Sequence, residues 1–133
     1  MVDCKKQIIT SPYGPRKDVF HHGVDLRSYD LTLYKPLAII FPERCRVLRI
    51  WHDGWGGGLA VKPLETDYDE FKFIHVGIRS EIIVDNEYGQ GYNIGYSMLS
   101  QLNKKHHLHF EVWRGGKSEN PINYFEARGI EYE

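Results

Sequence analysis

The sequence predicts a mainly β fold, an antiparallel sheet of sandwich or barrel type with one short helix near the C-terminal end. Apolar and polar residues alternate with a period of two along much of the chain, as expected when successive side chains point to opposite faces of a strand. Clusters of glycine, asparagine, aspartate and proline separate the alternating segments and indicate turns. Short strands at this spacing favour an antiparallel arrangement.

The alternating segments define the predicted strands, which are residues 45–53, 58–64, 70–76, 80–85, 92–97 and 107–113. One helix is predicted after them. Asn120 suits its N-cap, Pro121 its first position, and Gly129 the residue that ends it. No repeat, low-complexity tract or linker interrupts the pattern, so we expect a single domain over residues 1–133.

Composition and charge exclude several classes of protein. With 133 residues, 41% hydrophobic and 26% charged, the chain is globular rather than disordered. Its net charge of −1 speaks against nucleic acid or a membrane as a partner. The N-terminal segment lacks the apolar run of a signal peptide, and the aliphatic stretch 37–41 is too short to span a bilayer. If the protein acts outside the cytoplasm, we expect something else to deliver it.

Neither the cysteines nor the glycine run indicates a function. Cys4 and Cys45 are too far apart in sequence for a zinc-binding pair, and Cys45 lies at an apolar strand position. Their redox state is left open. The run "GWGGG" at 54–58 lacks the Gly-Lys-Ser/Thr ending of a phosphate loop and precedes no helix pattern, so we expect a flexible hairpin there.

The segment "HHLHFEVW" at 106–113 is the first candidate for chemistry. Leu108, Phe110 and Val112 form an apolar face, and the opposite face carries His107 and His109 with a carboxylate and an indole. A buried strand does not need two imidazoles side by side. A second pair occurs in "FHHGVDL", where His21 and Asp25 share a face if the segment is extended, with a glycine between them.

Zinc accounts for such a set of side chains. Catalytic zinc sites use three protein ligands and leave the fourth position to water, and His, Asp and His without cysteine fit that pattern. The remaining histidines have simpler interpretations. His52 suits a solvated loop, and His22 and His106 suit exposed or pocket-rim positions beside the better-placed histidines. His75, at the end of a predicted strand, suits a sheet position as well as a functional one.

Taken together, these motifs resemble the lysostaphin- and LytM-type zinc endopeptidases of bacterial cell walls over residues 8–125. The opening "SPYGPRKDVFHHGVDL" is similar to that family's turn followed by His-x-Gly-x-Asp, and "HLHFEVW" to its closing His-x-His strand. Between them, "WGGGLAVK", "FIHV" and "GYNIGYS" are similar to its glycine-rich hairpin, histidine-ending strand and glycine-punctuated turn. The two histidine motifs, in this order with a third histidine between them, are the specific part.

The resemblance implies roles for five residues and a twisted antiparallel sheet that forms a groove. His21, Asp25 and His109 would hold one Zn²⁺, and His75 and His107 would flank its open position. The metal would activate a water for attack on a peptide carbonyl, with one of these two histidines as general base and the other assisting the oxyanion or the leaving amine. Which histidine does which stays open.

Other polar and aromatic residues near these motifs have secondary interpretations. Glu111 is expected to be a rim or strand-pairing residue rather than the general base. Five aromatic residues are candidates for the walls of a substrate groove, although each also suits packing: Trp51, Trp55, Tyr92, Tyr96 and Trp113. The polar and basic residues 97–106 depart from the Gly/Ser/Thr-rich loop and proline common in the family, which puts the shape of the substrate pocket in doubt.

The predicted function is hydrolysis of peptide cross-links or stem peptides in bacterial peptidoglycan by a zinc metalloendopeptidase. The sequence favours a phage product, carried in the virion among other virion proteins or released at lysis, that acts at the cell wall. The alternatives are a catalytically silent wall-binding or regulatory module of the same type, and a zinc peptidase that acts on a protein. The bond that is cut and the oligomeric state are not predicted.

Overall fold

The computed structural model describes residues 1–28, 35–52, 57–99 and 105–133. In chain order its elements are β1 (Gln7–Ser11), β2 (Gly14–Pro15), β3 (Phe20–His21), β4 (Val24–Ser28), β5 (Ala38–Ile40), β6 (Cys45–Trp51), β7 (Gly58–Pro63), β8 (Glu70–Ile74), β9 (Val76–Ile78), β10 (Glu87–Tyr88), β11 (Asn93–Ser97), β12 (Leu108–Arg114), β13 (Lys117–Glu119) and α1 (Pro121–Arg128). The predicted mainly β fold with one short C-terminal helix is confirmed. No helix in the described ranges is long and apolar enough to cross a membrane.

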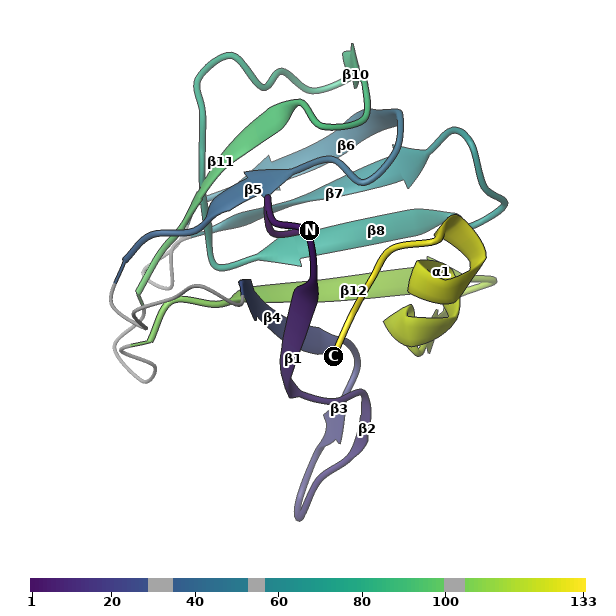
Figure 1. The fold of residues 1–133 in the computed structure, drawn as a ribbon. Coiled ribbons are helices and arrows are strands. Elements are labelled where there is room, and N and C mark those ends of the chain that lie inside the picture. The colour runs from purple at the N-terminus through teal and green to yellow at the C-terminus, as the bar shows by residue number, and fades with distance from the viewer. Residues whose placement is uncertain (29–34, 53–56, 100–104) are drawn as a thin grey trace.

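One large antiparallel sheet forms the framework of the molecule (Figure 1). Its strand order is β1-β4-β12-β8-β7-β6-β10, and β13 pairs with β12 beyond this path. A three-stranded sheet, β5-β11-β9, and a two-stranded hairpin, β2-β3, complete the strands. Because β4 and β8 lie on either side of β12, segments from the beginning, middle and end of the chain meet at the centre of the large sheet.

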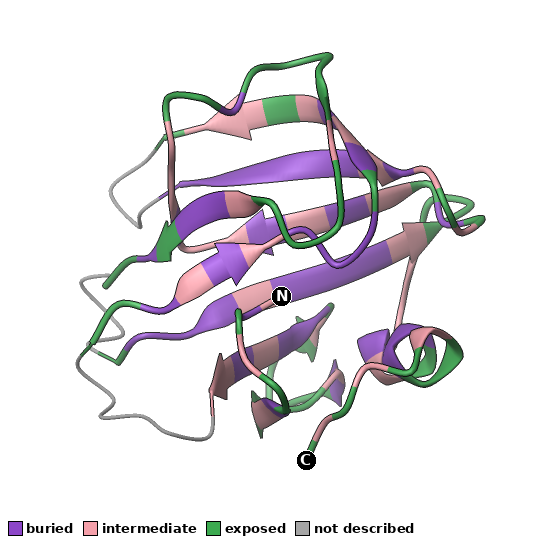
Figure 2. Cartoon of the chain, turned by 45° about the horizontal axis from the view of Figure 1, so that its top comes forward, coloured by how far each residue is buried: buried purple, intermediate pink, exposed green. Residues whose placement is uncertain are grey.

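The alternation of side chains in β12 divides this sheet into a core face and a second face. Phe110, from the apolar row of β12, is fully buried together with Phe71 of β8. The helix α1 packs on the core face, with Tyr124 4.7 Å from Phe71 and Phe125 5.9 Å from Phe110 between ring centroids. Figure 2 shows buried residues and residues of intermediate exposure interspersed along the central strands. The candidate functional residues of β12 belong to the opposite row.

The predicted helix is confirmed with its caps. The Asn120 side chain accepts a hydrogen bond from the backbone N–H of Ile122 at 3.1 Å, and Pro121 begins the helix. Gly129 ends the helix in the left-handed region, at a φ of 68°, where glycine is favoured because it has no Cβ. Cys45 is fully buried in β6, as expected.

Two strand predictions are wrong. Residues 80–85 form two consecutive turns rather than a strand, closed by hydrogen bonds from Ile82 N–H to the Arg79 carbonyl and from Asn86 N–H to the Ile83 carbonyl. Residues 70–76 are divided, because the chain leaves the large sheet after β8 and enters the small sheet as β9. For the predicted glycine hairpin, β6 and β7 pair as antiparallel neighbours, and residues 53–56 between them lie outside the described ranges.

Candidate metal centre

Three neighbouring segments position the candidate ligands. Asp25 of β4 and His109 of β12 lie directly opposite each other in the antiparallel register, which places their side chains side by side on one face. His21 ends β3, whose hairpin partner β2 pairs through Gly14. Strand register thus brings Asp25 to His109, and the β2-β3 hairpin supplies His21.

Gly23 makes this arrangement possible because β12 passes against it. A Cβ at position 23 would lie 2.3 Å from the Phe110 carbonyl oxygen and 2.9 Å from Cγ of Glu111. The sequence predicts that this glycine leaves room for an approaching group, and here that group is the neighbouring strand.

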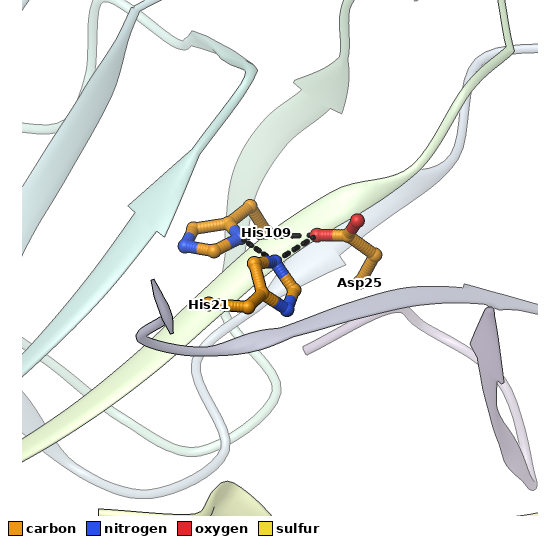
Figure 3. A group of neighbouring side chains, drawn as sticks. All are labelled: His21, Asp25 and His109. Atoms are coloured by element: carbon orange, nitrogen blue, oxygen red, sulfur yellow. Dashed lines mark hydrogen bonds and ion pairs between the residues drawn. The ribbon is translucent and has the colours of Figure 1, made fainter. Parts of the chain in front are cut away.

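The three side chains point toward one another, as Figure 3 shows. His21 Nε2 lies 3.2 Å from His109 Nδ1 and 3.3 Å from Asp25 Oδ1, and His109 Nδ1 lies 3.0 Å from the same oxygen. Zinc bonds of about 2.0–2.2 Å in a tetrahedron place ligand atoms about 3.3–3.5 Å apart. The triangle is therefore close to the size that a tetrahedral zinc ion requires, and three protein ligands leave its fourth position open.

The outer nitrogens of both histidines are held by hydrogen bonds. His21 Nδ1 donates to the Pro12 carbonyl at 2.8 Å, which leaves Nε2 for a metal. His109 Nε2 donates to Glu111 Oε2 at 2.7 Å, which leaves Nδ1. Such partners are typical of metal-ligating histidines, because they fix the ring orientation and the tautomer. The donor set therefore fits zinc in its geometry and in its chemistry.

The electrostatics of the three side chains favour a positive charge between them. Burial lowers the pKa of His109, but hydrogen bonds to Asp25 and Glu111 outweigh it and raise the pKa to about 9. Burial likewise raises the pKa of Asp25, but the hydrogen bond with His109 and nearby histidines bring it below its usual value. A proton on Nδ1 of His109 thus occupies the place that a metal cation would take.

His75 and His107 lie beside the candidate ligands. Their ring centroids are 4.9 Å apart, and the ring of His75 is 6.5 Å from that of His109. His107 is 8% exposed and its Nδ1 donates to the Lys105 carbonyl at 3.1 Å. His75 sits between β8 and β9, where its backbone N–H bonds to the Gly57 carbonyl and its carbonyl accepts from Met98. The structure thus brings all five predicted site residues into one group.

Solved structures with the same architecture are lysostaphin and LytU. The match to lysostaphin has a TM-score of 0.72 at 17% identity and covers 96% of this chain and 52% of the lysostaphin chain. The match to LytU has a TM-score of 0.72 at 23% identity and covers 94% of this chain and 88% of LytU. The chain adopts the lysostaphin-type fold. It spans about half the length of lysostaphin itself.

A third structure with the lysostaphin-type fold is a zinc-containing peptidase from Vibrio cholerae. The match has a TM-score of 0.66 at 15% identity and covers 92% of this chain and 40% of the peptidase chain. In comparisons of sequence, no protein-family model matches the chain, and no curated protein matches it. The neighbours establish the fold, and the chemistry of this chain is argued below from its own residues.

Two expectations about the exposure of residues beside the candidate metal centre are wrong. Glu111 is buried, at 8% exposure, and accepts hydrogen bonds from His109 and Trp113, so it is not a rim residue. The strand-pairing alternative holds, because Glu111 lies opposite Lys72 in the register of β12 and β8. His106 is also buried, and its Nδ1 shares a hydrogen bond of 2.9 Å with the Ser97 hydroxyl. The alternation pattern identifies the face of Glu111 but not its partners.

The remaining histidines and the aromatic candidates lie in several environments. His22 and His52 are exposed, as expected, and the ring of His22 stacks on Trp113 at 5.6 Å. Tyr92 and Tyr96 are exposed at 40% and 53%. Trp51 packs against Gly58, where a Cβ would lie 2.7 Å from its ring. Trp55 and residues 100–104, half of the loop at 97–106, lie outside the described residues.

Proposed function

We propose that this chain is a zinc-dependent endopeptidase that hydrolyses peptide cross-links or stem peptides of bacterial peptidoglycan. The observation that carries the proposal is the triangle of His21 Nε2, Asp25 Oδ1 and His109 Nδ1, with sides of 3.0–3.3 Å and with both outer imidazole nitrogens held. The paired rings of His75 and His107 beside it supply groups for proton transfer.

In the proposed mechanism His21, Asp25 and His109 hold the ion. When bound, zinc supplies Lewis acidity and lowers the pKa of a bound water toward neutrality. One of His75 and His107 accepts a proton from the attacking water as general base. The other donates a hydrogen bond to the oxyanion and then a proton to the leaving amine, so that the peptide C–N bond breaks with charge balanced.

The substrate class and the place of action rest on the lysostaphin-type fold. Lysostaphin is described as an antimicrobial peptidase from Staphylococcus simulans. We propose that this chain likewise acts as a peptidase, that its substrates are peptides of the bacterial cell wall, and that it acts at the wall. We further propose delivery to the wall as a phage product, in the virion or at lysis. Detection of the chain in purified phage particles would support the virion route.

Release of new amino groups from purified peptidoglycan tests the proposal. We expect release by the protein that is lost with a chelator, regained with zinc and absent in His107→Ala. His52→Ala removes an exposed histidine and is the matched control that should keep activity. Mass spectrometry of the fragments identifies the bond.

Two outcomes would contradict the proposal. Cleavage of soluble peptides but not of peptidoglycan would indicate a protein-directed peptidase. Binding to cell walls without cleavage, despite stoichiometric zinc, would indicate a silent wall-binding module.

A further inference from the structure

Glu111 lies next to the candidate ligands without being one of them. It follows His109 by two residues on β12, so both side chains are on the same face of the strand. Its two carboxylate oxygens have separate partners. Oε2 accepts from His109 Nε2 at 2.7 Å, and Oε1 accepts from Trp113 Nε1 at 2.7 Å.

The hydrogen bond from His109 bears on metal binding. A neutral imidazole carries its proton on one nitrogen and can ligate only through the other. In the candidate site the ligating atom of His109 is Nδ1, so the proton must stay on Nε2. Glu111 accepts that proton's hydrogen bond, and its side chain, at 11% exposure, leaves little room for water to take over this role.

Trp113 in turn restrains Glu111. The indole N–H is bonded to the carboxylate, and two other side chains contact the indole ring. The ring of His22 stacks on it at 5.6 Å with an interplanar angle of 23°, and Lys72 Nζ lies 4.6 Å from its centroid. Both oxygens of Glu111 are therefore committed, one to the ligand and one to a fixed ring.

We propose that Glu111 is a positioning residue that sets the zinc affinity of the site by keeping the His109 proton on Nε2, and that Trp113 fixes Glu111 for this task. The inference rests on the proposed function in one respect, that His21, Asp25 and His109 hold zinc. It adds a residue that does not touch the ion and acts through His109.

Glu111→Gln tests the proposal because glutamine offers one oxygen where glutamate offers two. One of the two donors, the imidazole N–H of His109 or the indole N–H of Trp113, then faces the amide NH₂ of the glutamine. We expect zinc affinity to fall about 10- to 100-fold, the range for loss of such a partner. Trp113→Phe alone leaves the carboxylate to His109 and should cost less. In the double variant the single oxygen is free for His109, so affinity should recover relative to Glu111→Gln.

The measurement is the Kd for Zn²⁺ by chelator competition at one fixed pH, with the His109 tautomer read from imidazole ¹⁵N shifts of the zinc form. Glu70→Gln is the matched control. Glu70 lies opposite Trp113 on β8 and is engaged with Arg49 and Lys72, so its loss should leave the Kd unchanged. Circular dichroism shows whether each metal-free variant folds. If Glu111→Gln does not fold, Glu111→Asp replaces it, because the aspartate side chain is one methylene too short to make both hydrogen bonds.

The outcomes separate the two proposals. Equal Kd values and an unchanged ¹⁵N pattern in Glu111→Gln and the unaltered protein would overturn the role of Glu111 and leave the proposed function standing. A double variant as weak as Glu111→Gln would overturn the role of Trp113. An unaltered protein that binds no zinc would overturn the metal site, and the role of Glu111 with it.

Discussion

His75 has a backbone conformation that is uncommon for a residue with a side chain. Its φ of 70° lies in the left-handed region, which costs an L-residue roughly 1–2 kcal/mol. Its backbone N–H and the next one both bond to the Gly57 carbonyl, at 2.9 and 3.2 Å, and its own carbonyl accepts from Met98 N–H. This conformation turns the chain from β8 to β9 and places the ring of His75 beside that of His107.

We therefore expect His75→Gly to be more stable than His75→Ala. Both variants lose the imidazole, so their difference isolates the backbone. Glycine avoids the left-handed cost but is more flexible when unfolded, which leaves a net advantage of up to about 1 kcal/mol. Urea denaturation of the two variants measures it. Equal urea midpoints would mean that the hydrogen bonds to Gly57 and Met98 hold this conformation without strain. Because both variants lack the imidazole, we expect neither of them to hydrolyse peptidoglycan.

At the scale of elements, Gly23 joins the β3-β4 segment to β12. In Gly23→Ala the added methyl group meets the Phe110 carbonyl at 2.3 Å, so the segment must move away from β12 and carry His21 from His109. We expect a loss of about 1–3 kcal/mol in the free energy of unfolding, as for overpacked sites, together with weaker zinc binding.

Gly89→Ala is the matched control for this prediction, because a Cβ at position 89 meets no atom within 4 Å. Urea denaturation and chelator competition on both variants give the answer. A Gly23→Ala protein with unchanged zinc affinity would show that the site tolerates displacement of β3.

His106 connects the end of β11 to the start of β12. The Ser97 hydroxyl bonds to His106 Nδ1 at 2.9 Å and accepts from Leu37 N–H at 2.8 Å. Burial lowers the pKa of His106 below its usual value, against the opposing effect of a hydrogen bond with the Ser97 backbone. Because the unfolded chain then binds a proton more readily than the folded one, this residue contributes stability above about pH 6.5 that is lost as the pH falls.

We expect the unfolding free energy of the unaltered protein to fall more steeply between about pH 7 and 5 than that of His106→Gln, which cannot titrate. The other histidines are common to both proteins, so the difference between the two curves belongs to His106. Urea denaturation across this pH range measures it. Parallel curves would mean that folding does not change the affinity of His106 for a proton.

The same elements show how far sequence reasoning extends. Period-two alternation and cap residues predict strands such as 107–113 and the helix, because both patterns are local. The segment 80–85 also has strand-like composition, yet Ile83 and Val84 are exposed in turns, and among the described residues no strand pairs with them. Predicted strand boundaries are wrong where pairing with a strand from elsewhere in the chain determines them.

For the site, spacing and resemblance identify the residues that converge, since His-x-Gly-x-Asp and His-x-His are local motifs. The partners of Glu111 and His106 are not predicted. Glu111 shares a face with both His109 and Trp113, but which hydrogen bonds form depends on the charge of Lys72 from β8 and on the ring of His22, which follows β3. His106 is buried because Ser97, from another sheet, approaches it.

At the scale of the whole molecule, the candidate metal centre connects distant parts of the chain. His109 lies 84 residues from Asp25 and 88 from His21. The two ends of the chain also meet at β1, where Gln7 N–H bonds to the Glu131 carbonyl and Glu133 N–H to the Gln7 carbonyl. The three candidate ligands converge only when β4 has paired with β12 and the β2-β3 hairpin is in place, so an ion held by all three would bind the folded state.

We therefore expect zinc to stabilise the whole domain. At a free zinc concentration 100 times the Kd, the gain is about 2.7 kcal/mol, which for a chain of this size raises Tm by roughly 8–10 °C. Thermal unfolding with zinc and with a chelator measures it. Asp25→Asn, which keeps the shape of the side chain and removes its charge, should lose most of the shift. An equal shift in Asp25→Asn would place the ion at other residues of the chain.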